Sequence, residues 1–285
     1  MTSARFPPPI PPLDVRDLLR RYGLHARKRL GQNFLQDTYA LERIVEAASI
    51  LPSDTVLEIG PGLGSLTRYL AAVAKIVIAV ELDERLFPAL QAVVAPYDNL
   101  RLVHGDILES DPAELVGEPD YLVVANIPYY ITSALIRHLL EKDSRPRRLL
   151  LTVQKEVANR ICAGPGAMSL LSLSVQVYGD PSVAAHIPAR AFYPPPNVDS
   201  AILRIDVFPK PAIPQAQLES FFQLIRAGFS QKRKTLRNSL SAGMRRGSGE
   251  IEAILGKAGI DPKRRAETLD LQEWGRLSRL FHEAG

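Results

Sequence analysis

The residues best suited to chemistry lie directly after short apolar runs of this 285-residue chain. Three glycines, Gly60, Gly62 and Gly64, follow the run Val56–Ile59 at alternate positions. Glycine adopts backbone angles that strain other residues and places no side chain between the backbone and a ligand. The pattern predicts a strand, a glycine turn and a helix capped by Ser65, the first unit of a nucleotide-binding α/β fold. An ordinary tight turn is the alternative.

Acidic residues follow the next two apolar runs. Glu81 ends the run Ile76–Val80, 21 positions after Gly60, the spacing of a carboxylate that binds ribose hydroxyls. Asp106 follows the run Leu100–His104 and is a candidate acceptor for an adenine amino group, or simply a turn residue. The glycines read Gly-x-Gly-x-Gly, and no Lys-Ser or Lys-Thr pair follows them. These features favour an adenosine ligand without a pyrophosphate, and we expect S-adenosylmethionine.

The fourth apolar run ends in the tetrapeptide Asn126-Ile127-Pro128-Tyr129. Proline fixes its own backbone and restrains the residue before it to an extended conformation. The side-chain oxygen of Asn126 and nearby backbone carbonyls can then converge on one exocyclic amine. Tyr129 supplies a flat face on which a purine can stack. The tetrapeptide therefore predicts a site that holds the amine of a base, although Asn-x-Pro is also a common turn signal.

Composition places the chain among soluble proteins. Hydrophobic residues make up 46% and charged residues 23%, and no apolar run is long enough to span a bilayer. The proline-rich residues 1–12 lack the apolar core of a secretory signal and are expected to form a flexible lead. Cys162 is the only cysteine, which excludes an internal disulfide and a cysteine-based metal site. We expect a cytoplasmic protein without a metal or a membrane association.

Positive charge concentrates near the C-terminus. Residues 206–285 contain 14 Lys and Arg against 9 Asp and Glu, and residues 226–246 contain seven basic residues and no acid. A solvated basic helix face is the ordinary explanation of such a run. At this density, a polyanionic partner is the better interpretation.

Hydrophobic periodicity predicts alternating strands and helices followed by helices alone. We expect an α/β, Rossmann-like catalytic domain at residues 13–208 and a small all-helical domain at residues 209–285, with a proline-spaced linker at 209–214. Expected strands include 170–178 and 201–205. The expected helices of the second domain cover residues 218–229, 233–240, 251–256 and 271–281.

Several motifs together resemble one protein family. They are Leu30-Gly-Gln-Asn-Phe-Leu35, Glu58-Ile-Gly-Pro-Gly-Leu-Gly64, Asn126-Ile-Pro-Tyr129, Gln154-Lys-Glu-Val157, Phe192-Tyr-Pro-Pro-Pro196, Val198-Asp-Ser200, Gln231-Lys-Arg-Lys-Thr-Leu-Arg-Asn-Ser239, Gly259-Ile-Asp-Pro262 and Arg265-Ala-Glu267. The chain resembles the ribosomal RNA adenine N6-dimethyltransferases, and within them the enzymes of the small subunit. The resemblance covers nearly everything after the proline-rich lead. It implies a class I S-adenosylmethionine-dependent methyltransferase fold.

The resemblance also implies roles for individual residues. It implies methyl transfer to N6 of two adjacent adenosines in a hairpin loop near the 3′ end of small-subunit ribosomal RNA, coupled to small-subunit biogenesis. The expected catalytic residues are Asn126, Ile127, Pro128, Tyr129 and Phe192, the last closing over the other side of the base. The expected cofactor-binding residues are Gln32, Asn33, Leu35, Gly60, Gly62, Glu81, Leu82, Asp106, Ile107 and Asn126. The expected RNA-binding residues are Arg27, Lys28, Arg29, Lys232, Arg233, Lys234 and Arg237.

The sequence departs from the family pattern at two places. Asn197 stands where a lysine is usual before Val-Asp-Ser, and the segment 166–172 lacks an expected Tyr-Gly pair. Both departures affect the positioning of RNA more than the chemistry.

Three other functions compete with this prediction. A methyltransferase of the large-subunit, antibiotic-resistance type shares the catalytic domain, but the motifs of the second domain weigh against it. A DNA adenine methyltransferase is less well supported, because those enzymes usually carry Asp-Pro-Pro-Tyr or Asn-Pro-Pro-Tyr instead of the Asn-Ile-Pro-Tyr of this chain. A non-catalytic RNA-binding or ribosome-assembly factor could retain the fold. We expect a monomer that acts on small-subunit RNA within an immature small subunit.

Overall fold

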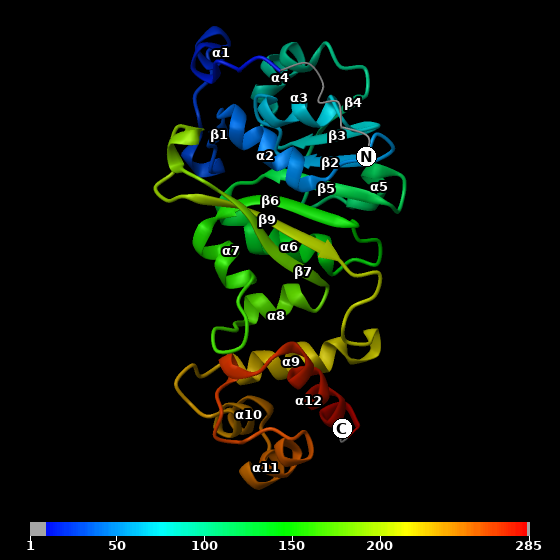
Figure 1. The fold of residues 1–285 in the computed structure, drawn as a ribbon, viewed down its shortest axis with the longest axis vertical. Coiled ribbons are helices and arrows are strands. Elements are labelled where there is room, and N and C mark those ends of the chain that lie inside the picture. Colours follow the sequence, from blue (N-terminus) through cyan, green and yellow to red (C-terminus); the bar gives the residue numbers. More distant parts are fainter. Residues whose placement is uncertain (1–9, 284–285) are drawn as a thin grey trace, which may run out of the picture. The chain divides into compact units, whose positions relative to one another are not determined.

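The structure, a computed structural model, describes residues 10–283, so most of the proline-rich lead lies outside the described residues. The chain forms two compact units (Figure 1). The first unit runs to Ala158 and resumes over Ser182–Val207, and the second contains Asn159–Pro181 and everything from Phe208 onward. The sequence predicted a single boundary at residue 209. The structure instead groups residues 159–181 with the C-terminal helices.

A seven-stranded sheet forms the centre of the first unit, in the order β4-β3-β2-β5-β6-β9-β7. Strands β2 to β6 are mutually parallel, and β9 runs antiparallel to β6. Apolar residues dominate β2, β3, β5 and β6 because helices cover a parallel sheet on both faces. This architecture confirms the α/β, Rossmann-like class. The strands are β2 (Thr55–Ile59), β3 (Ile76–Glu81), β4 (Leu100–His104), β5 (Tyr121–Asn126), β6 (Arg148–Gln154), β7 (Gly179–Ile187) and β9 (Ser200–Val207).

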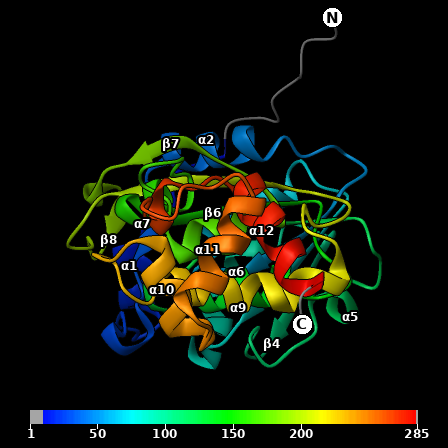
Figure 2. The same cartoon turned by 90° about the horizontal axis from the view of Figure 1, so that it is seen from below.

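The strand order reverses between β2 and β5, and in such sheets ligands bind at the carboxyl ends of the strands beside this reversal. In Figure 2, α2 and α6 lie on either side of β6. Helices α2 and α3 pack on one face of the sheet, where Ile44, Leu70 and Val77 belong to one buried cluster. The helices of this unit are α1 (Val15–Arg21), α2 (Thr38–Ala48), α3 (Ser65–Ala71), α4 (Phe87–Val94), α5 (Pro112–Val116), α6 (Thr132–Leu140) and α7 (Lys155–Ile161), whose end belongs to the second unit.

Helix α3 begins at a glycine rather than at a capping serine. Gly64 is the N-cap residue with a φ of 84°, and Ser65 is the first residue of the helix. The Ser65 hydroxyl has no hydrogen-bond partner among the described residues. The predicted serine cap is therefore wrong, because the left-handed backbone at the start of α3 favours glycine there.

A second, two-stranded sheet joins the N-terminal segment to the aromatic-proline loop. Strand β1 (Phe34–Leu35) pairs antiparallel with β8 (Phe192–Tyr193), so that Leu35 lies opposite Phe192. The pairing fixes the end of the motif Leu30-Gly-Gln-Asn-Phe-Leu35.

The second unit is helical. It contains α8 (Leu170–Gln176), α9 (Leu218–Phe229), α10 (Leu236–Met244), α11 (Ser248–Lys257) and α12 (Leu271–Glu283). Trp274 is completely buried and stacks on Phe229, with ring centroids 5.9 Å apart. The four helices predicted after the linker are all present, with first residues that differ by up to three positions and last residues by up to four.

Residues 170–178 were predicted as a strand but form helix α8. Ser169 and Ser172 make a reciprocal capping box: the Ser169 hydroxyl accepts the Ser172 N–H at 3.1 Å, and the Ser172 hydroxyl accepts the Ser169 N–H at 2.7 Å. A short apolar run does not distinguish a strand from a buried helix, and here the cap determines the outcome. The strand that the sequence analysis missed, β7, comes directly afterwards and contains Pro181, which is compatible with its position at the sheet edge.

Gly243 allows two helices of the second unit to approach one another closely. A Cβ added to Gly243 in α10 would lie 2.5 Å from Cβ and 2.7 Å from Cα of Ala227 in α9. We therefore expect Gly243→Ala to destabilise the chain by at least about 2 kcal/mol, because the helix backbones must separate. Gly256→Ala in α11 is the matched control. Its Cβ meets nothing within 4 Å, and alanine improves helix propensity. Thermal unfolding of both variants tests this, and equal melting temperatures would contradict it.

Candidate active site

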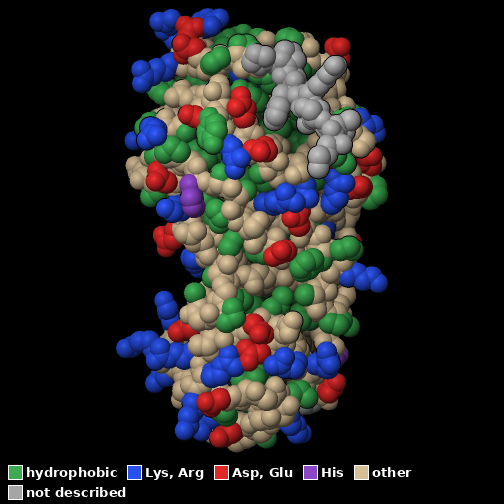
Figure 3. Space-filling view, viewed as in Figure 1, with side chains coloured by type: hydrophobic (Ala, Val, Ile, Leu, Met, Phe, Trp, Pro, Cys, Tyr) green, Lys and Arg blue, Asp and Glu red, His purple; other side chains and the backbone are tan. Residues whose placement is uncertain are grey.

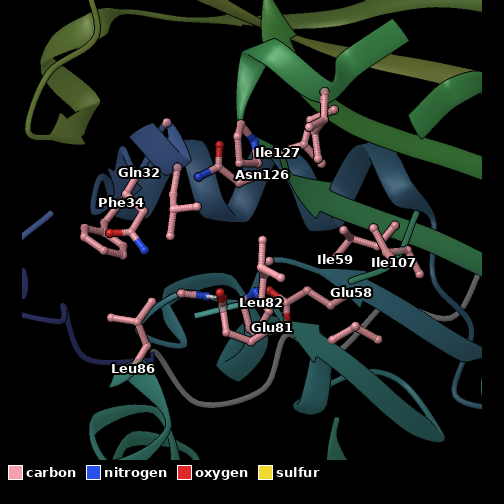
Figure 4. A pocket seen from close by; sticks show the side chains of 18 of the residues that line it. Gln32, Phe34, Glu58, Ile59, Glu81, Leu82, Leu86, Ile107, Asn126 and Ile127 are labelled. Carbon is pink, nitrogen blue, oxygen red and sulfur yellow. Dashed lines mark hydrogen bonds between the residues drawn. The ribbon is translucent and has the colours of Figure 1, made fainter. Parts of the chain in front are cut away.

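A cavity opens at the carboxyl ends of β2, β3, β4 and β5, where the sequence placed the ligand. The glycine turn, the strand ends and the segment before β1 all contribute to its wall. In Figure 4, the side chains of Glu58 and Glu81 lie on one side of the cavity, and Asn126 lies across from them. All but one of the predicted catalytic and cofactor-binding residues line it: Gln32, Asn33, Leu35, Gly60, Gly62, Glu81, Leu82, Asp106, Ile107, Asn126, Ile127, Pro128 and Tyr129.

The glycine turn requires its glycines for two reasons. Gly60, Gly62 and Gly64 all have positive φ values, of 68°, 61° and 84°. A Cβ on Gly62 would also lie 3.1 Å from the ring of Phe34. The Gly60 N–H donates to the carbonyl of Val80 at 2.9 Å, which ties the turn to the neighbouring strand. The turn therefore leaves bare backbone on the cavity wall.

Glu81 is held in a fixed orientation at the end of β3. Its Oε2 accepts the Gly62 N–H at 2.9 Å, and its Oε1 accepts the Asp83 N–H at 2.8 Å. Burial raises the pKa of Glu81, and these two hydrogen bonds oppose the rise. Each carboxylate oxygen retains accepting capacity toward the cavity. The arrangement suits a diol such as a ribose.

Glu58 is a second buried carboxyl group on the cavity wall, and the sequence analysis assigned it no role. Burial raises its pKa to about 8; the Thr67 hydroxyl opposes the rise and the charge of Glu81 adds to it. Its Oε2 has no hydrogen-bond partner among the described residues. At neutral pH the group is therefore mostly protonated in the folded chain. The charged residue type in an otherwise apolar strand is the signal that could have identified it.

The raised pKa of Glu58, about 8, predicts a pH-dependent stability. In the unfolded chain Glu58 loses its proton near its ordinary pKa, whereas the folded chain retains it. The contribution to stability is therefore complete below the unfolded pKa and is lost as the pH rises through about 8. Each pKa unit corresponds to about 1.4 kcal/mol. We expect the melting temperature to decline less between acid and alkaline pH in Glu58→Gln than in the native chain.

The control for that experiment is Glu46→Gln, because the Glu46 side chain is 59% exposed. This variant should follow the native pH profile. Identical profiles for Glu58→Gln and the native chain would show that Glu58 titrates normally.

The segment before β1 is tied to Asp83, whose N–H donates to Glu81 on the cavity wall. Gln32 donates to Asp83 Oδ2 at 2.9 Å, and its own Oε1 accepts the Arg27 N–H at 2.8 Å. Arg85 donates to both carboxylate oxygens of Asp83, at 2.9 and 2.6 Å. Burial favours a raised pKa for Asp83, but the hydrogen bonds from Arg85 and Gln32 together hold it below the usual value. Gln32 thus lines the cavity and also anchors the segment at residues 27–31, which contains Arg27, Lys28 and Arg29.

Asn126 at the end of β5 has one of its two polar groups already engaged. Its Nδ2 donates to the backbone carbonyl of Asn33 at 3.1 Å. The Asn33 side chain in turn donates to the carbonyl of Gly31 at 3.1 Å. This chain of hydrogen bonds fixes the Asn126 amide and leaves its Oδ1 as an acceptor at the cavity.

Tyr129 is held by its hydroxyl group. That hydroxyl and the Ser200 hydroxyl share a hydrogen bond of 2.6 Å, and burial raises the Tyr129 pKa. The bond restrains the ring on the cavity wall, as a stacking surface requires. Ile127, which follows Asn126 in the tetrapeptide, is buried and positions the turn.

Phe192 is the predicted catalytic residue that the structure does not bring to the cavity. Its side chain is 2% exposed and belongs to the cluster beneath the sheet. The neighbouring Tyr193 lies under the guanidinium of Arg16, 4.9 Å from the ring centroid. The pairing of β8 with β1 turns the Phe192 ring into the protein, away from the position that the family resemblance implies.

The predicted RNA-binding residues fall into two groups, one in each unit. Lys28 and Arg29 are exposed in the short 3-10 helix η1 (Lys28–Leu30), whereas Arg27 lies 3.9 Å from Asp83. In the second unit, Arg237 pairs with Glu252 at 3.3 Å. Lys232, Arg233 and Lys234 are exposed between α9 and α10, and Figure 3 shows lysine and arginine side chains over this region.

Two findings bear on what else the described residues hold. Within residues 10–283, no His, Cys, Asp and Glu side chains gather in groups of three or more that could hold a metal ion. No helix in this range is both long and apolar enough to cross a membrane.

Comparisons with known proteins agree on one family. The family model described as "Ribosomal RNA adenine dimethylase" matches residues 23–281. A ribosomal RNA small subunit methyltransferase A from Dehalococcoides mccartyi is 48% identical over 271 residues, covering 94% of this chain and 93% of that protein. The enzyme of that name from Moorella thermoacetica is 46% identical over 273 residues, covering 92% of this chain and 94% of that protein.

Solved structures agree with this fold. A dimethyladenosine transferase from Plasmodium falciparum superposes with a TM-score of 0.74 at 26% identity, over 88% of this chain and 98% of that chain. The 23S rRNA methyltransferase ErmE superposes with a TM-score of 0.72 at 30% identity, over 88% of this chain and 100% of that chain.

Proposed function

The chain belongs to the ribosomal RNA adenine dimethylase family, and from that premise we propose that it dimethylates N6 of two adjacent adenosines in small-subunit ribosomal RNA. The two adenosines would lie in a hairpin loop near the 3′ end of that RNA. The relatives that share 46–48% of its residues over nearly their whole length are named for the small subunit. The observation that carries the proposal is the fixed Asn126 amide, whose oxygen faces a cavity that Glu81 closes on the other side.

S-adenosylmethionine is the proposed methyl donor, and the cavity residues fit it. Glu81 offers two oriented acceptors for ribose hydroxyls, and Asp106 offers a carboxylate near an adenine. Leu82 and Ile107 offer apolar surface for the purine ring. Gly60 and Gly62 have no side chains, so the amino-acid part of the cofactor, with its charged groups, can approach the backbone closely. When bound, this cofactor supplies an electrophilic methyl group on a sulfonium centre.

The protein residues contribute alignment. Asn126 Oδ1 accepts one N–H of the adenine amine, and a backbone carbonyl of the tetrapeptide accepts the other. These bonds draw the nitrogen lone pair out of conjugation with the ring and direct it into the cavity. Tyr129, held by Ser200, supports the plane of the base. Transfer to a strong electrophile requires orientation more than a strong base, so an amide suffices at this position. The target adenosine must leave its base stack to reach the cavity.

The proposed division of labour follows the two units. The first unit carries the chemistry, and the helical domain at 209–285 of the second unit binds RNA in an immature small subunit. The exposed Lys232, Arg233 and Lys234 support this role, because lysine and arginine neutralise phosphates. We further propose that the chain acts in the cytoplasm as a monomer.

The test is the transfer of labelled methyl from S-adenosylmethionine to unmethylated small and large ribosomal subunits in parallel, with nucleoside analysis of the products. We expect N6,N6-dimethyladenosine in the small subunit alone. Label in the large subunit alone would indicate that the chain methylates 23S rRNA, the RNA for which ErmE is named. Binding to the small subunit without transfer would indicate an assembly factor.

A further inference from the structure

One exposed aromatic ring at the mouth of the cavity has no role in the proposed chemistry. Tyr130 follows the tetrapeptide in the 3-10 helix η3 (Tyr129–Ile131) and lines the cavity, yet 62% of its surface is exposed. Its hydroxyl has no hydrogen bond with another described residue. By contrast, Phe192 is buried and Tyr129 is bonded to Ser200.

The segment at residues 27–31 passes close to this ring. A Cβ added to Gly31 would lie 3.1 Å from Cβ of Pro128 and 3.3 and 3.4 Å from two ring carbons of Tyr130. Gly31 has a φ of 61° and ends helix η1, so its backbone passes close to the ring. The Gly31 backbone therefore supports one part of the ring, and the rest stays open to solvent.

Two exposed cations precede Gly31 in the same segment. Lys28 and Arg29 stand in η1, within three residues of Gly31, and both are exposed. Neither forms an ion pair with the described residues, whereas Arg27 lies near Asp83. An open aromatic ring close to a segment that carries unpaired cations suits single-stranded nucleic acid, with a base on the ring and phosphates on the cations.

We propose that Tyr130, together with Lys28 and Arg29, forms a subsite for the nucleotide next to the target adenosine. The base of that nucleotide stacks on the Tyr130 ring, and its phosphate contacts the two cations. The proposal rests on the proposed function, since it assumes that an adenosine of an RNA loop occupies the cavity. It assigns to Tyr130 a positioning role in binding RNA and none in the transfer itself.

The first experiment measures the kinetics of methyl transfer to unmethylated small subunits. We expect Tyr130→Ala to raise the KM for the subunit about tenfold, as the loss of one base–aromatic stack implies. Its kcat and its Kd for S-adenosylmethionine should stay close to the native values. Tyr130→Phe keeps the ring and should restore the native KM. Tyr39→Ala, which removes a tyrosine that is 70% exposed on α2, is the matched control. A KM for Tyr130→Ala within twofold of the native value overturns the proposal.

The second experiment separates this proposal from the proposed function. It uses a hairpin RNA with two adjacent adenosines, in which fluorescent 2-aminopurine replaces the second one. Stacking on Tyr130 should quench its emission in the native chain, in Tyr130→Phe and in the inactive Asn126→Ala, but not in Tyr130→Ala. Tyr130-dependent quenching in a chain that transfers no methyl group keeps the subsite and rejects the enzyme. Equal emission in all chains, quenched or not, overturns the subsite.

Discussion

Replacing Asn126 with alanine is expected to slow methyl transfer by roughly 10²- to 10³-fold, the usual loss when one preorganised polar group of an active site is removed. The variant loses the acceptor that orients the adenine amine, and it also leaves the carbonyl of Asn33 without its 3.1 Å partner. The cavity wall otherwise remains the same. Single-turnover transfer at saturating cofactor and RNA measures the loss, because it excludes effects on binding and on product release.

Asn126→Asp sharpens the interpretation. Aspartate keeps an acceptor oxygen but cannot donate to the Asn33 carbonyl, so the orientation of the side chain is lost. We expect this variant to be nearly as slow as Asn126→Ala. Both should bind small subunits with affinities within a few fold of the native values. Native rates in Asn126→Ala would reject the amide as the group that orients the amine.

Replacing Glu81 with alanine is expected to weaken the binding of S-adenosylmethionine on the order of 100-fold, from the loss of two hydrogen bonds to a charged group. The change also removes the acceptor of the hydrogen bonds that the Gly62 and Asp83 N–H groups donate to Glu81. The glycine turn therefore loses its anchor together with the ligand. Calorimetric titration with S-adenosylmethionine measures the effect directly.

Two further variants test whether the carboxylate itself matters. Glu81→Gln retains oxygen and size but accepts fewer hydrogen bonds, so its loss of affinity should be intermediate. Glu84→Ala removes an exposed acid three positions later and should bind normally. RNA affinity should be unchanged in all three. An unchanged cofactor Kd in Glu81→Ala would place the ribose elsewhere.

Much of the site could be predicted because its residues follow strands directly. Gly60, Glu81, Asp106 and Asn126 each stand just past an apolar run, and parallel strands bring their carboxyl ends to one edge of the sheet. Spacing along the chain therefore translates into proximity in space. The helices after residue 214 were equally accessible, since their apolar residues recur at helical period.

Other features of the fold and the site could not be predicted, because they depend on contacts between segments that are distant in the sequence. Phe192 is buried because β8 pairs with β1, and no local pattern indicates a two-residue strand that pairs so far along the chain. Residues 170–178 are apolar enough for either a strand or a helix, and a reciprocal serine cap decides between them. Gln32 is anchored by Asp83, which lies 51 positions further along the chain. Such pairings are properties of the assembled fold.

The segment 159–181 belongs to the second unit although both of its neighbours in sequence belong to the first. Backbone hydrogen bonds tie it there: Gly166 and Met168 donate to the carbonyl of Glu267 at 2.8 and 3.2 Å. Phe208 and Ala212 likewise donate to the carbonyls of Tyr178 and Val177, both at 2.8 Å.

Because residues 159–181 of the second unit lie between the two parts of the first unit in the sequence, the arrangement has consequences for synthesis and for recombination. During translation, β6 emerges as an open sheet edge and stays open until β9 follows, with the second unit already begun in between. An uncovered apolar strand pairs readily with other chains, so a nascent chain that stalls before Val207 is prone to aggregate. Recombination between relatives at the proline-spaced linker would separate residues 166–178 from their partners.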